Sequence, residues 1–88
     1  MSTYNLTIAT PDGNRFQGEV MGLFVRGAEG DLAVLAGHMP FITSVKAGAC
    51  RIHLPDGEEK SATLDGGLLT VSDKTATLLS GSFSWDEE

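Results

Sequence analysis

Two short stretches of the chain carry residue types that could do chemistry. Gly27–Asp31 reads GAEGD and Gly37–Pro40 reads GHMP, which brings together glycines, two acids and a histidine. A phosphate-binding loop would need a lysine after its last glycine and then a helix, and Gly27–Asp31 offers neither. Its two acids would also repel a phosphate. Tight turns are the better interpretation, because glycine reaches positive φ without a steric penalty.

Cys50 and the two histidines are the remaining candidates for nucleophilic or metal chemistry. Cys50 and His53 are three residues apart, so in a strand they point to opposite faces and cannot form a nucleophile–base pair. A metal site needs three or four ligands, and the sequence around His38 and His53 supplies no such set. We therefore expect no catalytic residue, no metal and no cofactor, with Cys50 as an inert core residue.

His38 lies in a segment that should project from the surface. Pro40 keeps Met39 extended, and Gly37 frees the preceding turn. Two interpretations of His38 stay open: a contact surface for another protein, or a half-buried histidine satisfied by backbone groups.

The elements that must position these residues are strands. The longest stretch without glycine or proline is Leu68–Ser80, and it contains the turn-like pair Asp73–Lys74. An ordinary helix of about 11–12 residues therefore has almost no place. Apolar and polar residues alternate instead, as in Tyr4–Ile8, and turn signals such as Pro11–Asn14 and Pro55–Glu58 separate the alternating segments.

Nine or ten short strands follow from this alternation. They are Thr3–Ile8, Arg15–Val20, Met21–Arg26, Asp31–Leu35, Ile42–Val45, Ala49–Leu54, Lys60–Leu64, Leu68–Val71, Thr75–Leu79 and a last piece with Phe83 and Trp85. Strands this short need two facing sheets to bury their apolar sides, so the pattern is typical of one antiparallel β-sandwich or flattened barrel. The two aromatics of the last piece either close the core or form a ligand platform.

The charge balance narrows the partners. The 88 residues include twelve Asp and Glu against six Lys and Arg, a net charge of -6. This disfavours nucleic acid and anionic lipid, both of which attract clustered Lys and Arg. A single cysteine, no leader-like N-terminus and no apolar run near ~20 residues indicate a soluble protein of a reducing compartment.

At this point the sequence resembles a known family. Val25–Thr43, Gly48, Arg51–Ile52 and Gly66–Val71 match the order and spacing of elements in the epsilon subunit of F-type ATP synthases. The resemblance continues through Tyr4–Leu6 and Phe16–Gly18 and covers essentially the whole chain. It implies an all-β fold, a ten-stranded antiparallel β-sandwich of two facing five-stranded sheets, formed as one domain over residues 1–88.

The resemblance also implies a function. An epsilon subunit is a non-catalytic rotor piece of the central stalk, which links the gamma subunit to the membrane ring of c subunits and couples proton flow to ATP synthesis. It would lie at the cytoplasmic face of the bacterial plasma membrane, peripheral and attached through protein contacts. The competing hypothesis is a stand-alone β-sandwich that binds a peptide or a small ligand.

Residue roles are carried over in the same way. The residues that the resemblance implies at the c-ring are Glu29, Gly30, Asp31, His38, Met39 and Pro40. The candidates for the gamma-facing surface come from the alternation instead: Phe24, Phe41 and Ile42 are apolar residues out of phase with the inward positions, and a sandwich with solvated outer faces should not need them outside. Most family members continue into a C-terminal helical hairpin that binds ATP in some cases. Since the sequence stops just past its last expected strand, we expect neither the hairpin nor ATP binding.

Overall fold

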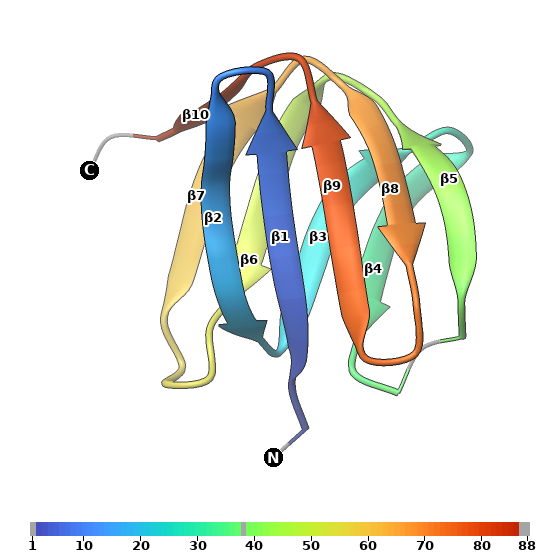
Figure 1. Ribbon diagram of the computed structural model, residues 1–88, viewed down its shortest axis with the longest axis vertical. Coiled ribbons are helices and arrows are strands. Elements are labelled where there is room, and N and C mark those ends of the chain that lie inside the picture. Colours follow the sequence, from blue (N-terminus) through green and yellow to red (C-terminus); the bar gives the residue numbers. More distant parts are fainter. Residues whose placement is uncertain (1, 38, 87–88) are drawn as a thin grey trace.

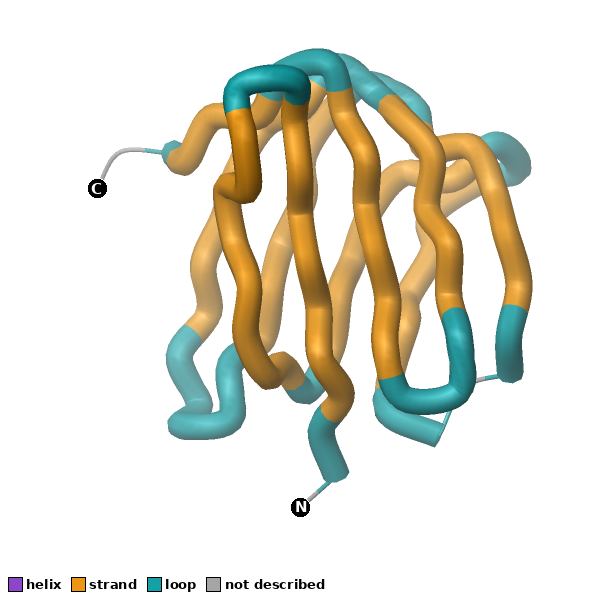
Figure 2. The backbone as a smooth tube through the Cα atoms, in the orientation of Figure 1, coloured by secondary structure: helices purple, strands orange, loops and turns teal. Residues whose placement is uncertain are grey.

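The computed structural model describes residues 2–37 and 39–86, and these form ten strands and no helix (Figures 1 and 2). It therefore holds no helix in this part that could cross a membrane. The strands are β1 (Tyr4–Thr10), β2 (Gly13–Val20), β3 (Gly22–Gly27), β4 (Gly30–Leu35), β5 (Phe41–Val45), β6 (Gly48–His53), β7 (Glu59–Leu64), β8 (Gly67–Val71), β9 (Thr75–Ser80) and β10 (Phe83–Trp85).

The strands form two layers that face each other. Hydrogen bonding follows the order β10-β7-β6-β3 and then β5-β8-β9-β1-β2, with β4 paired to β3. Figure 1 shows β2, β1, β9, β8 and β5 in front of the other five strands. A single pair, Gly27 with Val45, joins β3 to β5 and so connects the two layers. The expected all-β sandwich is confirmed, and its two five-stranded layers are halves of one ten-stranded sheet.

One strand pair departs from the antiparallel expectation. β1 lies parallel to β9, in register from Asn5–Thr75 to Ala9–Leu79. β1 and β9 lie near opposite ends of the sequence, so no hairpin turn joins them. Turn chemistry therefore does not set their relative direction. β1 lies between β2 and β9 in the sheet. The first strand of the sequence is therefore an interior strand of the front layer.

The core is built from the inward side of every strand. Its buried apolar residues are Tyr4, Leu6, Ile8, Val20, Leu23, Val25, Val34, Val45, Cys50, Ile52, Ala62, Leu64, Leu69, Val71, Ala76, Leu78 and Phe83. The Tyr4 hydroxyl donates a hydrogen bond of 2.7 Å to the Val34 carbonyl, which links β1 in one layer to β4 in the other. Burial raises the pKa of Tyr4 well above its usual range, so the phenol remains a donor.

Cys50 is fully buried in this core, as expected. Burial raises the pKa of the Cys50 thiol to about 12, so almost no thiolate is present at neutral pH. Since the thiolate is the nucleophilic form, burial disfavours nucleophilic chemistry at Cys50.

The last strand closes one side of the sandwich with aromatic rings. Phe83 is buried and packs edge-on against Trp85 at 4.9 Å between ring centroids, and Phe16 of β2 lies 6.1 Å from Trp85. Lys60 places its ammonium 4.7 Å from the Trp85 ring centroid. These contacts favour the core-closing interpretation of the two aromatics over a ligand platform.

Asp65 fastens the corner where β7 leads into β8. Its Oδ1 accepts hydrogen bonds from the Ser82 backbone N–H at 3.0 Å and from the Ser80 hydroxyl at 3.1 Å. The hydrogen bonds from Ser82 and Ser80 hold the pKa of the Asp65 carboxyl below its usual value. The ionised carboxylate therefore stabilises the folded chain.

Replacing Asp65 with asparagine is expected to make the free energy of unfolding less dependent on pH in the acid range. A lowered folded pKa means that the stabilisation is complete above the unfolded pKa and is lost as pH falls through the folded value. The Asp65→Asn variant should be less stable at neutral pH, and the gap should shrink below about pH 4. Urea midpoints across this range check it, with Asp73→Asn in the exposed β8–β9 turn as control. A constant gap at every pH would contradict the role assigned to Asp65.

Candidate protein-docking surfaces

Part of the outer side of the front layer carries no charge. Two rows of cross-strand neighbours run across β5, β8, β9, β1 and β2. One row is Ile42, Thr70, Thr77, Thr7 and Gln17, and the other is Ser44, Leu68, Leu79, Ala9 and Asn14. We call these ten residues the uncharged face. A fifth of the chain is charged, yet neither row holds a charge.

The uncharged face also exposes large apolar side chains. Ile42 is 67% exposed, Leu79 is 48% exposed and Leu68 is 43% exposed, and Leu68 and Leu79 are direct cross-strand partners. Of the described residues, only Leu35 and Met39 are further large hydrophobics with this much exposure. Contiguous exposed apolar side chains mark interaction sites, whereas scattered ones are ordinary. The uncharged face is therefore suited to docking.

The acidic turn between β3 and β4 lies beside this face. Ala28 and Glu29 form the turn, and Gly30 and Asp31 follow as the first two, exposed residues of β4. β5 pairs with β3 only through Val45 and Gly27, and no pairing is found between β4 and β5 in the described residues. The space between β4 and β5 is an open hollow lined by Gly27, Ala28, Glu29, Gly30, Asp31, Leu32, Phe41, Ile42 and Thr43. Acidic side chains from the turn and apolar ones from β5 thus share one hollow.

The second predicted loop lies at the other end of β4. Met39 and Pro40 lie between the end of β4 and the start of β5, and Met39 is 79% exposed. A strand of six residues such as β4 spans roughly 17 Å. The two loops therefore form separate surfaces rather than one patch. His38 lies outside the described residues.

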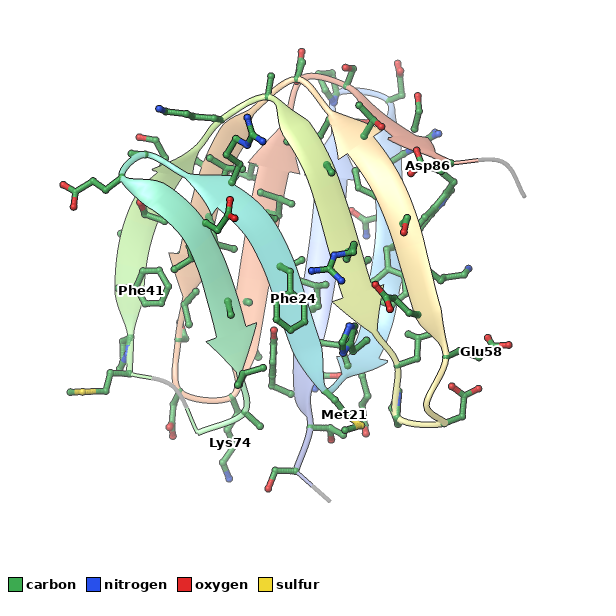
Figure 3. All side chains as sticks on the ribbon, turned by 180° about the vertical axis from the view of Figure 1, so that it is seen from behind. Met21, Phe24, Phe41, Glu58, Lys74 and Asp86 are labelled. Carbon is green, nitrogen blue, oxygen red and sulfur yellow. The ribbon has the colours of Figure 1, made fainter. Side chains whose placement is uncertain are left out.

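The three residues expected to face gamma do not share a surface. Ile42 is on the uncharged face, whereas Phe24 lies on the outer side of the back layer, where Figure 3 shows it on β3. Phe41 is partly buried and packs against the core. Of these three residues, Ile42 alone lies on the uncharged face.

Sequence reasoning missed Leu68 and Leu79 as surface residues. A signal was present, because Leu68–Leu69 and Leu78–Leu79 are adjacent apolar pairs, and in a strand one member of each must point outward. What the pattern could not show is that the two outward members are paired across β8 and β9.

Cys50 and His53, the described candidates for nucleophilic or metal chemistry, lie apart from each other. Within residues 2–37 and 39–86, no three His, Cys, Asp or Glu side chains gather as metal ligands. His53 lies 3.6 Å from Glu59 and stacks near Phe24, on the other side of the strand from Cys50. The expected separation of Cys50 and His53 is thus confirmed.

The described residues form a small β-sandwich with exposed surfaces suited to docking. Residues 3–86 match the family described as the ATP synthase delta/epsilon chain β-sandwich domain. The chain belongs to this family.

Individual relatives agree with the family. The sequence is 36% identical over 98% of its length to the "ATP synthase epsilon chain, sodium ion specific" of Acetobacterium woodii, and 39% identical over 90% of its length to the "ATP synthase epsilon chain" of Psychrobacter cryohalolentis. It spans 65% and 57% of these two relatives.

Solved structures show the same fold. A chain of the Euglena gracilis mitochondrial ATP synthase structure, OSCP/F1/c-ring, aligns with a TM-score of 0.90 at 22% identity, over 97% of this chain and 54% of that one. A chain of the Tetrahymena thermophila central stalk/c-ring structure aligns with a TM-score of 0.76 at 13% identity, over 90% and 63% of the two chains. At these identities the likeness establishes the shared fold.

Proposed function

We propose that this domain is a non-catalytic part of the central stalk of an F-type ATP synthase, which links the gamma subunit to the c-ring and so couples ion flow to ATP synthesis. The observation that carries the proposal is the uncharged face with Ile42, Leu68 and Leu79 exposed, in a chain that belongs to the epsilon-chain family. In this role the protein is peripheral to the cytoplasmic side of a bacterial plasma membrane and is held there by other subunits.

The uncharged face is the docking surface for gamma. Fully burying one Leu or Ile side chain contributes about 1.5–3 kcal/mol, and three such side chains lie on this face. The threonines and serine between them can satisfy hydrogen bonds at an interface without bringing in a charge that must be desolvated. Phe24 lies on the opposite outer side of the sandwich and is not part of this interface.

The acidic turn is the contact to the c-ring. Glu29 and Asp31 are exposed and flank Gly30, whose φ of +133° favours glycine. Because Ile42 lines the same hollow, the ring contact and the gamma contact adjoin at this edge of the domain. Met39 and Pro40 lie about one strand length away and reach the ring or gamma as a separate contact.

Reversing the two charges of the acidic turn is expected to uncouple the complex without unfolding the domain. In an ATP synthase that contains the Glu29→Lys and Asp31→Lys variant, we expect ion-driven ATP synthesis to fall at least about tenfold, because mismatched charges at an interface cost several kcal/mol. ATP synthesis in inverted membrane vesicles measures the effect, and urea unfolding of the domain checks the fold.

The β6–β7 turn supplies a matched control. Asp56, Gly57 and Glu58 repeat the acid-glycine-acid order of the acidic turn on a different hairpin. The Asp56→Lys and Glu58→Lys variant makes the same charge change and should leave coupling intact. Equal loss in both variants, or normal coupling in the first, would contradict the assignment of the acidic turn to the ring.

A further inference from the structure

The outer side of the back layer holds a second hollow, which shares Asp31 and Leu32 with the hollow beside the acidic turn. Its volume is about 290 Å³, close to the lower limit of roughly 300 Å³ for small-molecule sites. Strands β3, β4 and β6 line it with Phe24, Val25, Arg26, Asp31, Leu32, Ala33, Ala49 and Arg51. It lies on the side of the sandwich that faces away from the uncharged face (Figure 3).

A glycine and two alanines shape the hollow. An added Cβ on Gly22 would lie 3.2 Å from Phe24 Cε2, so the phenyl ring leans over Gly22 and reaches His53, 4.6 Å away between ring centroids. The cross-strand partner of Phe24 on β4 is Ala33, and Ala49 lies on β6. Because the side chains of Ala33 and Ala49 are short, they form the bottom of the hollow, and the Phe24 ring forms an apolar side of it.

Two arginines border the hollow. The Arg51 guanidinium lies 5.2 Å from the Phe24 ring centroid, and its Nη1 donates to Glu59 Oε2 at 3.0 Å. Both contacts fix its orientation, and a guanidinium has five N–H donors, more than this one bond requires. Arg26 on β3 passes beside Gly48, where an added Cβ would lie 3.7 Å from its Nε. Two of the three arginines of the chain therefore meet at one hollow.

The charges around the hollow favour an anion at the arginine end. In a chain with a net charge of -6, the lining holds Arg26 and Arg51 against one acid, Asp31, which is the cross-strand partner of Arg26. Arginine binds carboxylates through parallel N–H bonds, and such charge-assisted bonds are about twice as strong as neutral ones. Asp31 competes with an incoming anion for Arg26, and Glu59, outside the lining, competes for Arg51.

We propose that this hollow binds a small organic carboxylate with a flat apolar body. The carboxylate would accept hydrogen bonds from Arg26 and Arg51, and the body would lie on Ala33 and Ala49 against the Phe24 ring. This inference does not rest on the proposed function: gamma docks on the opposite face, and among the described residues assigned to the ring only Asp31 borders the hollow.

Benzoate is the probe, with benzamide and acetate as partial analogues. Amide chemical shifts of the ¹⁵N-labelled chain are followed during each titration. Benzoate should produce saturable shifts at Phe24, Ala33, Ala49 and Arg51. Benzamide lacks the charge and acetate lacks the apolar body, so each should bind at least about tenfold more weakly. Equal effects of benzoate and benzamide, or shifts spread evenly over the domain, would overturn the proposal.

Three variants test the arginines directly. Arg26→Gln and Arg51→Gln should each weaken benzoate binding about tenfold or more, since each removes a charge-assisted contact. Lys74→Gln in the β8–β9 turn removes the same charge away from the hollow and should change nothing. Asp31→Asn should strengthen binding, because it removes the competing carboxylate. Unchanged affinity in both arginine variants, or weaker binding by Asp31→Asn, would contradict the site.

A carboxylate can also be carried by another protein as a glutamate side chain. A blocked Leu-Glu-Leu peptide presents that source in the same titration. The proposal predicts that benzoate binds and the peptide binds more weakly. Shifts at the hollow with the peptide but not with benzoate would assign the arginines to a protein contact and overturn the small-molecule site.

Discussion

The Leu79→Asp variant is expected to bind the gamma subunit at least about 100-fold more weakly than the unaltered chain. Leu79 lies in the middle of the uncharged face, between Leu68 of β8 and Ala9 of β1. The substitution removes about 1.5–3 kcal/mol of apolar burial and forces a carboxylate out of water. About 1.4 kcal/mol of binding free energy corresponds to a tenfold change in affinity. The two losses together therefore exceed a 100-fold change. Titration calorimetry with purified gamma subunit measures it.

Leu35 provides the matched control for this variant. It is also a half-exposed leucine in a strand, but it lies on β4 in the back layer. Leu35→Asp introduces the same charge and should leave gamma binding within a few-fold of the unaltered chain. Urea unfolding of both variants separates lost binding from lost folding. If Leu35→Asp weakened binding as much as Leu79→Asp, the uncharged face would not be the gamma surface.

The Gly67→Ala variant is expected to destabilise the domain by about 3 kcal/mol or more. An added Cβ on Gly67 would overlap the carbonyl oxygen of Leu79. β8 and β9 would therefore have to separate where β8 begins, next to the uncharged face. The total stability of a chain this size is about 4–13 kcal/mol, so the loss is a large share of it. Urea or thermal unfolding measures the change.

Gly18 is the control glycine for this prediction. It lies in edge strand β2, and an added Cβ would meet Phe16 at 3.7 Å, an ordinary contact distance. Gly18→Ala should therefore cost under about 1 kcal/mol. A small loss in Gly67→Ala, comparable with that of Gly18→Ala, would show that the β8–β9 pair has more room than the structure implies.

Strand identity followed from local sequence because period-two alternation reports burial directly. Cys50 was predicted correctly as a core residue, on the strand face opposite to His53. The turns at Pro11 and Pro55 lie at the positions that their glycine and proline residues predicted. What alternation cannot report is which distant strands become neighbours, and the parallel β1–β9 pair was missed for that reason.

The docking surface depended on those long-range pairings. Phe41 and Ile42 are adjacent in sequence, and only the pairing of β5 with β8 decides that Ile42 points outward while Phe41 packs inward. Likewise, Leu68 and Leu79 become one patch through the β8–β9 register. The acidic turn was predictable because its glycine and charges are local, whereas its closeness to Ile42 required the fold.

The most direct test of the stalk assignment is to map the gamma interface on this chain by amide hydrogen–deuterium exchange, with and without purified gamma subunit. Our account predicts new protection at Ile42, Leu68 and Leu79 and their strand neighbours in β5, β8 and β9. It predicts unchanged exchange around Phe24 and Arg51 in the back layer. Protection confined to the back layer, or no protection anywhere at saturating gamma, would contradict the account.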